Sequence, residues 1–343
     1  MLISGILLVV TIFAVVVILA NLAERRAEWR GPLHGALLTL NILFAINYGL
    51  AEGGTLFTSL LAIGFGGAAT LLLMRPARAR LAAIFPPRRA NAQGETVGFD
   101  PASPLHMTAL VLCLYLLGNT VLSYALAGGL SGLAEEFRGP TGGGVTMDVL
   151  SPGNLLAQMA IFVLFGALGV GLGTRRTIPA TLERLGLRAP TLREIGGSMG
   201  MAFLLFWSAF LIGSVWQMLV PPDMLQEQTE LSGLIAGSID TMSMAFMVAL
   251  TAAVGEEIAF RGALQPVFGL WPTAALFVLT HIQYTLTPAA LVILIVALGF
   301  GWVRRRYNTT AAIAAHFFYN AALLAIAVYG QYIFDMLDML QWF

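Results

Sequence analysis

Long runs of apolar residues recur along the whole chain, and the stretches between them hold most of the charged residues. An apolar run of about 17 to 25 residues is long enough to cross a bilayer as a helix. The pattern therefore predicts an all-α protein, a polytopic transmembrane helical bundle with about ten spans. The predicted spans are Leu2–Leu22, Pro32–Ala51, Gly54–Met74, Leu105–Ala127, Asn154–Gly173, Gly196–Val220, Ile239–Ala263, Pro272–Tyr284, Pro288–Val303 and Thr310–Phe334.

The composition supports a membrane protein. Of the 343 residues, 58% are hydrophobic and 10% are charged, whereas soluble domains carry about 25% charged residues. The 18 basic and 18 acidic residues balance, and no basic block or stripe suggests nucleic acid. Cys113 is the only cysteine, which excludes a disulfide framework and a cysteine zinc site.

Arginine residues gather in alternate connections, which predicts an orientation. They follow the first, third, fifth and ninth predicted spans, whereas the connections Glu52–Gly54, Ser131–Gly153 and Pro221–Gly233 are acidic. Basic residues in short loops mark the cytoplasmic side. The N-terminus is therefore predicted outside and the basic loops in the cytoplasm. The apolar run that begins at Leu2 lacks a basic start, so we interpret it as a retained span.

Loop length and composition suggest three parts. Residues 1–74 form a predicted N-terminal three-helix membrane unit, residues 75–104 a basic cytoplasmic linker, and residues 105–343 the main membrane core. Within the core, the stretch Thr181–Gly196 predicts a short amphipathic helix and then a turn at Ala189 and Pro190.

Ionisable side chains inside the predicted spans are few. Charged groups in the bilayer cost about 2.5–3.5 kcal/mol on insertion scales, so they survive by pairing or by facing a cavity. The stretch GEEIAFRG places Glu256, Glu257 and Arg261 in an apolar setting. Residues four apart share a helix face, which predicts an ion pair between Glu257 and Arg261. The same spacing joins Phe277 to His281 and His316 to Asn320.

The predicted depths of these residues agree. Glu256, His281 and His316 each lie about ten residues, or roughly 14 Å, from the predicted cytoplasmic edge. A shared depth on three helices is typical of one polar cavity. Asp240, His34 and His106 lie near span ends instead, and we interpret them as interfacial residues.

These side chains have the chemistry for amide hydrolysis. A carboxylate beside a histidine can deprotonate a water molecule, and a second histidine with an asparagine can donate to an oxyanion. No cofactor is needed for that chemistry. Zinc held by Glu256, His281 and His316 is an alternative, although the HExxH pattern does not occur in the chain.

The three motifs in this order resemble those of the CPBP intramembrane proteases, also called the CAAX protease or Abi family. Glu256-Glu257-x-x-x-Arg261, Phe277-x-x-x-His281 and His316-x-x-x-Asn320 carry the resemblance, which covers residues 234–327. It implies an endopeptidase in which Glu256 and His281 activate water while His316 and Asn320 form the oxyanion hole. Glu257, Arg261 and Phe277 match supporting positions.

The resemblance also implies a membrane-associated peptide or protein substrate, and a bacterial inner membrane as the location. The oligomeric state stays open. Two alternatives keep the same residues. One is a non-catalytic scaffold or regulator that binds a partner through Ser131–Gly153 or the three N-terminal spans. The other is a proton-coupled transporter, which the lack of an inverted repeat disfavours.

Overall fold

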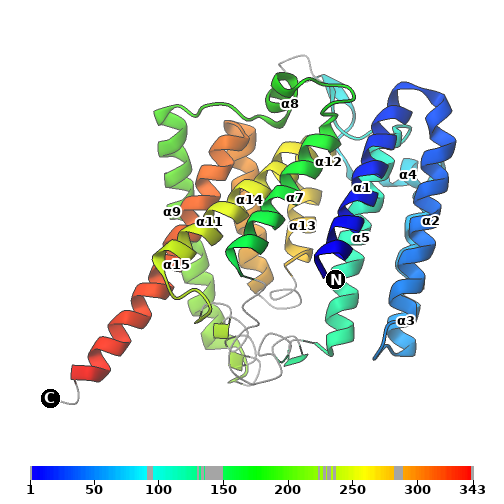
Figure 1. Ribbon diagram of the computed structural model, residues 1–343. Coiled ribbons are helices and arrows are strands. Elements are labelled where there is room, and N and C mark those ends of the chain that lie inside the picture. The colour runs from blue at the N-terminus through cyan, green and yellow to red at the C-terminus, as the bar shows by residue number, and fades with distance from the viewer. Residues whose placement is uncertain are drawn as a thin grey trace. The chain divides into compact units, whose positions relative to one another are not determined.

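A computed structural model shows a chain that is helical in nearly every described part (Figure 1). It describes residues 2–90, 96–129, 131–132, 135, 150–222, 225–226, 229, 233–234, 237–281 and 289–340. Each predicted span contains a helix. These helices are α1 (Leu2–Arg25), α2 (Arg30–Gly49), α3 (Leu56–Leu71), α5 (Pro104–Ala127), α7 (Pro152–Val170), α9 (Leu192–Leu219), α11 (Met242–Glu256), α13 (Leu270–Leu279), α14 (Ala289–Arg306) and α15 (Thr309–Leu340).

The class of an all-α polytopic membrane protein is confirmed, with fewer complete spans than the ten predicted. Among the described residues, 6 helices are long and apolar enough to cross a membrane. A further span is possible if Leu56–Leu71 and Arg75–Ile84, which are bent by 97°, count as one. α13 has 10 residues, about 15 Å, which is half of the bilayer core. α14 ends in three arginines, Arg304, Arg305 and Arg306, which shorten its apolar part.

The segment predicted as a linker contains ordered elements. It holds α4 (Arg75–Leu81), a 3₁₀ turn (Ala82–Ile84), and the antiparallel strands β1 (Arg89–Ala90) and β2 (Thr96–Val97). The guanidinium group of Arg78 donates to the carbonyl groups of Leu72, Leu73 and Pro101, so it satisfies free acceptors at the end of α3.

The chain divides into two compact units. The first unit comprises Met1–Leu126, Val163–Leu187 and Ala259–Ile282, and the second comprises Ala127–Phe162, Arg188–Ile258 and Gln283–Phe343. Each unit thus combines segments that are far apart in the sequence. The division at residues 74 and 104 stays a prediction.

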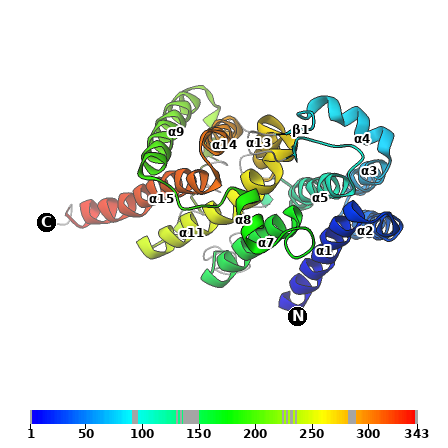
Figure 2. The same cartoon turned by 90° about the horizontal axis from the view of Figure 1, so that it is seen from above.

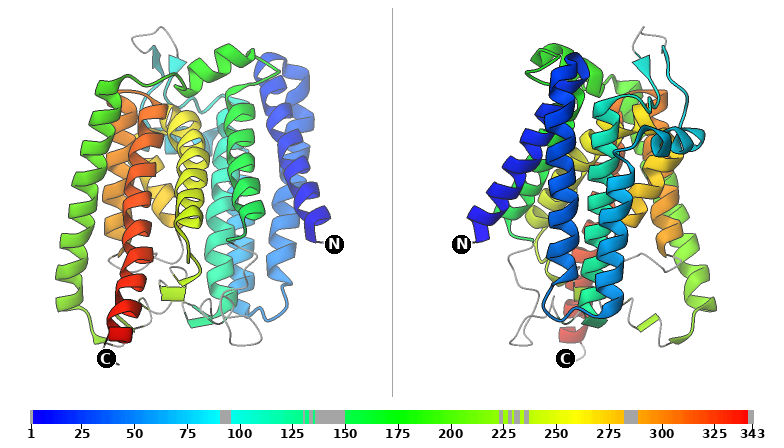
Figure 3. Two further views of the ribbon diagram at one scale, coloured as in Figure 1. Left: turned by 60° about the vertical axis from the view of Figure 1, so that its left-hand side comes forward. Right: turned by 90° about the vertical axis from the view of Figure 1, so that its right-hand side faces the viewer.

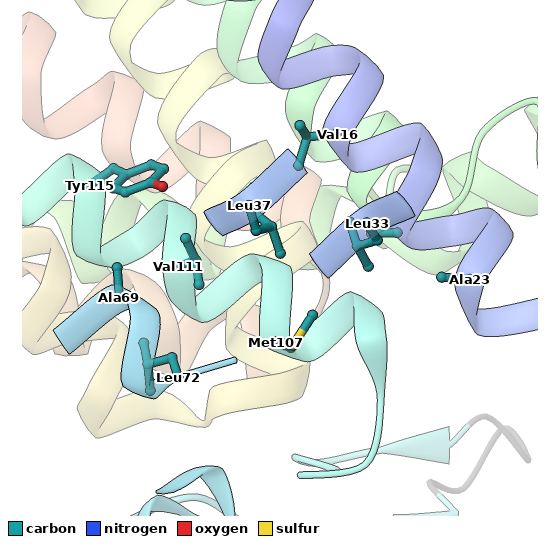
Figure 4. Close-up of a cluster of buried hydrophobic side chains, with 10 residues drawn as sticks. Val16, Ala23, Leu33, Leu37, Ala69, Leu72, Met107, Val111 and Tyr115 are labelled. Carbon is teal, nitrogen blue, oxygen red and sulfur yellow. The ribbon is translucent and has the colours of Figure 1, made fainter. Parts of the chain in front are cut away.

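The core of the first unit lies among α1, α2, α3 and α5, which are side by side in Figure 2. Figure 4 shows the side chains that these helices contribute, among them Val16, Ala23, Leu33, Leu37, Ala69, Leu72, Met107, Val111 and Tyr115. A hydrogen bond between the Tyr115 hydroxyl and Asn41 adds a polar tie between α5 and α2. This unit also contains α8 (Ile178–Leu185), the predicted amphipathic helix, which ends at Gly186 with a φ of 73°.

The second unit is built on α9, α11, α14 and α15. Figure 3 (left) shows that α9 and α15 begin at the same end and run in one direction, while α11 and α14 run in the other. The buried residues between α9, α14 and α15 are Ala202, Leu205, Val296, Phe300, Val303, Ala311, Ala312, Ala315 and Tyr319. Small residues on α15 let its neighbours approach closely, as in many membrane helix pairs.

Candidate functional site

The stretch GEEIAFRG lies where α11 changes its helical form. α11 ends at Glu256, and a π-helix spans Glu257–Leu264 before α12 (Gln265–Phe268). A π-helix forms bonds between residues five apart and is frequent at functional sites. The sequence predicted a regular helix here.

The two glycines of this stretch allow close helix contacts. A Cβ atom on Gly255 would lie 3.1 Å from the Cα of Met159 on α7. One on Gly262 would lie 3.1 Å from Leu185 Cδ2 and 3.2 Å from the Leu185 carbonyl oxygen at the end of α8. Arg184 on α8 also donates to the carbonyl oxygen of Gly262, at 3.2 Å. The backbone of the stretch is therefore in close contact with α7 at Gly255 and with α8 at Gly262.

Glu257 contacts His316 across two helices of the second unit. Its Oε1 atom lies 2.9 Å from Nδ1 of His316, and both side chains are buried, at 0% and 6% exposure. The ring of Phe300 stacks on the imidazole of His316 at a centroid distance of 4.6 Å. One edge and one face of the His316 ring are thus fixed. The sequence did not predict this pair, since its members are 59 residues apart.

Glu256 and Asn320 lie in the same unit as this pair. Glu256 is the last residue of α11 and is half-buried, so it is less enclosed than Glu257. Asn320 is half-buried on α15, one turn after His316 and on the same helix face. The contact between Glu257 and His316 agrees with the shared depth that the sequence predicts for α11 and α15.

Arg261, Phe277 and His281 belong to the first unit. The guanidinium carbon of Arg261 lies 4.3 Å from the centre of the Phe277 ring, within the range of a cation–π interaction. Phe260 meets the same ring edge-on at 5.1 Å. Phe277 is therefore the buried platform for Arg261. The predicted ion pair between Glu257 and Arg261 stays a prediction.

His281 lies just beyond the end of α13, not inside a helix. The helix ends at Leu279 instead of the predicted Tyr284, and residues 282–288 lie outside the described part of the chain. The reason is local, because the side chains of Thr280 and His281 turn back to the carbonyl oxygen of Phe277. The carbonyl groups at a helix end need such partners.

The contact with Phe277 fixes the proton on His281. Nδ1 of His281 lies 2.7 Å from the Phe277 carbonyl oxygen. A carbonyl oxygen only accepts hydrogen bonds, so Nδ1 must carry the hydrogen. In the neutral ring, Nε2 then carries the lone pair, which is the basic site of the ring. The backbone carbonyl of Phe277 thus binds His281, and the Phe277 ring contacts Arg261.

The structure brings the predicted site residues together in two groups. Glu257 meets His316 in the second unit, with Glu256 and Asn320 on the same two helices. Arg261, Phe277 and His281 meet in the first unit. In the part of the chain that the structure describes, no cluster of three or more His, Cys, Asp or Glu side chains could hold a metal ion. The zinc alternative stays a prediction.

Residues 238–322, about a quarter of the chain, match a family model described as type II CAAX prenyl endopeptidase Rce1-like. The matched region includes every motif residue from Glu256 to Asn320. Comparison with curated proteins and with solved structures gives no match. The match confirms the resemblance that the three motifs indicate, and it indicates a peptide hydrolase.

Proposed function

We propose that the chain is an intramembrane endopeptidase of the CPBP/CAAX type, which cleaves membrane-associated peptides or proteins by direct attack of water. Glu256 and His281 activate the water. His316 and Asn320 donate to the oxyanion, and Glu257 supports His316. Arg261 and Phe277 hold the surrounding helices.

The buried contact between Glu257 and His316 is the observation that carries this proposal. With Glu257 ionised, the hydrogen on Nδ1 of His316 points at Oε1, and we assign the opposite nitrogen, Nε2, to the substrate. When the ring carries a second proton, Nε2 becomes a donor and the carboxylate balances the charge. A preorganised hydrogen-bond donor is what an oxyanion hole requires.

His281 is prepared for the opposite task. Its Nδ1 donates a hydrogen bond to the Phe277 carbonyl, so Nε2 of the neutral ring can accept a hydrogen bond from water. His281 joins Glu256 in this proposal through its motif and its predicted depth. The carboxylate of Glu256 takes the proton of the water as the oxygen attacks the peptide carbonyl carbon, and that proton later goes to the leaving amine.

The substrate class follows from the family and from the membrane setting. The matched family is named for prenyl CAAX endopeptidases, so a prenylated peptide that ends in a CAAX sequence is the first candidate substrate. The prenyl group of such a peptide partitions into the bilayer, where helices of this protein present their apolar faces.

The test compares wild type with Glu256→Gln, both purified in detergent. Each is incubated with unmodified peptides and with farnesylated CAAX peptides, with and without a chelator, and cleavage is read by mass spectrometry. We expect cleavage by wild type alone, unchanged by the chelator. Glu183→Gln on the exposed side of α8 is the matched control and should cleave as wild type does.

Equal cleavage by wild type and Glu256→Gln would overturn the proposed role of Glu256. Loss of cleavage on chelation would favour the zinc alternative, in which Glu256, His281 and His316 hold the metal. A wild type that cleaves none of these peptides would count for the scaffold alternative.

A further inference from the structure

A buried carboxylate outside the motifs lies at the start of α9. Glu194 accepts hydrogen bonds from the backbone and the hydroxyl of Thr191, at 2.8 and 3.1 Å, and from both terminal nitrogens of the Arg188 guanidinium group. A fifth donor comes from another helix, because Nδ2 of Asn308 lies 3.0 Å from Oε1. Charge-assisted bonds of this kind are about twice as strong as neutral ones.

Asn308 carries that link directly into α15. It is the residue before Thr309, and its Oδ1 accepts from the backbone nitrogen of Ala311 at 2.9 Å. This is the bond of an N-cap, which satisfies a free donor of the first helical turn. One buried amide therefore caps α15 on one side and binds the Glu194 carboxylate on the other.

Further contacts tie the same two helix ends together. Ser198 Oγ lies 2.8 Å from the carbonyl oxygens of both Glu194 and Ala311. The backbone nitrogen of Arg188 donates to the Thr310 hydroxyl at 3.2 Å. All of these residues belong to the second unit, and Figure 3 (left) shows α9 and α15 starting at one end. The start of α15 is thus fixed against the start of α9.

We infer that Glu194 and Asn308 are positioning residues for His316. His316 lies on α15 about two turns, roughly 11 Å, after Thr309, and an α-helix transmits an axial shift of its end along its length. The contacts of Glu194 and Asn308, which we call the anchor, therefore set where His316 meets Glu257. The inference rests on the proposed function for its catalytic meaning. A misplacement of 1 Å at a catalytic group can cost about 100-fold in rate.

A purely local role predicts something different. Glu194 and Thr191 form a capping box, which stabilises α9 whatever happens at α15. Asn308→Ser separates the two roles. A serine hydroxyl caps a helix as well as asparagine does, so α15 keeps its cap, but serine lacks the amide that reaches Glu194.

The experiment uses the full-length protein in detergent and two readouts. Selective ¹⁵N labelling of the 4 histidines gives imidazole signals, and His316→Gln identifies those of His316. The kcat and KM values are measured with a fluorogenic farnesylated CAAX peptide. The variants are Glu194→Gln and Asn308→Ser, and Glu183→Gln is the control.

We expect the His316 signals to move in both variants and to stay in the control. We expect kcat to fall about tenfold in Asn308→Ser, with KM within about twofold of wild type, because only the position of a reacting group changes. His316 signals that stay unmoved in folded Asn308→Ser, or signals that move while kcat is unchanged, would overturn the inference. If wild type cleaves nothing, or Glu256→Gln cleaves equally well, the proposed function fails, and the imidazole signals still decide whether the anchor positions His316.

Discussion

Replacing Glu257 by glutamine tests the role of the buried pair most directly. The variant keeps the shape of the side chain and an oxygen for Nδ1 of His316, but it removes the charge. At the observed 2.9 Å, two unit charges attract by roughly 6 kcal/mol for an effective dielectric constant of about 20. Desolvation of the buried pair offsets much of this. A net contribution of about 1.5–3 kcal/mol is typical of a hydrogen bond to a charged group. We therefore expect kcat to fall by about 10- to 200-fold.

The assay is steady-state cleavage of a fluorogenic farnesylated CAAX peptide by detergent-purified protein. Glu183→Gln makes the same chemical change at an exposed site and should keep the wild-type kcat. The double variant of Glu257→Gln and His316→Gln should be no slower than His316→Gln alone, because residues that act as a unit are not additive. Full turnover by folded Glu257→Gln protein would refute the argument that this carboxylate supports the oxyanion donor.

Two further substitutions test the packing around the motifs. Gly262→Ala should lower the apparent Tm by several degrees, since the added Cβ lies 3.2 Å from the Leu185 carbonyl oxygen, which cannot rotate away. A Tm equal to that of wild type would contradict the contact. Phe277→Leu should reduce the free energy of unfolding by about 1–2 kcal/mol through loss of the ring beneath Arg261, while the backbone bond to His281 survives. Thermal unfolding in detergent checks both, with Leu279→Ala on an exposed part of α13 as the control, and an unchanged stability of Phe277→Leu would contradict the cation–π role.

The helices could be predicted from the sequence because the bilayer demands long apolar runs. Each run contains a helix, but α9 begins at Leu192, before the predicted Gly196, because Thr191 and Glu194 form a capping box there. The predicted end of α13 was wrong by several residues. The predicted span continued to Tyr284, and only the side-chain bonds of Thr280 and His281 to one carbonyl show that the helix stops.

The π-helix and the pair of Glu257 with His316 could not be predicted for a different reason. An extra residue in one turn leaves the apolar pattern almost unchanged, so the sequence does not reveal the change of helical form. Spacing rules compare residues within one helix, whereas Glu257 and His316 are 59 residues apart. The same limit hides Asn308, whose cap is local but whose bond to Glu194 joins two helices.

In the proposed mechanism, the partners of the two motif histidines would let one residue type perform two tasks. His281 donates a hydrogen bond from Nδ1 to a backbone carbonyl, so in the neutral ring Nε2 carries the lone pair that can accept a hydrogen bond from water. His316 faces a carboxylate, which balances the charge whenever the ring carries two protons and Nε2 is a donor. Glu257, the second glutamate of the EExxxR motif, therefore contacts a motif residue of another helix, His316. The partner of each histidine, and not the residue type, thus decides its proposed role. Glu257→Gln should therefore impair His316 as the oxyanion donor and leave His281 intact as the water-activating group.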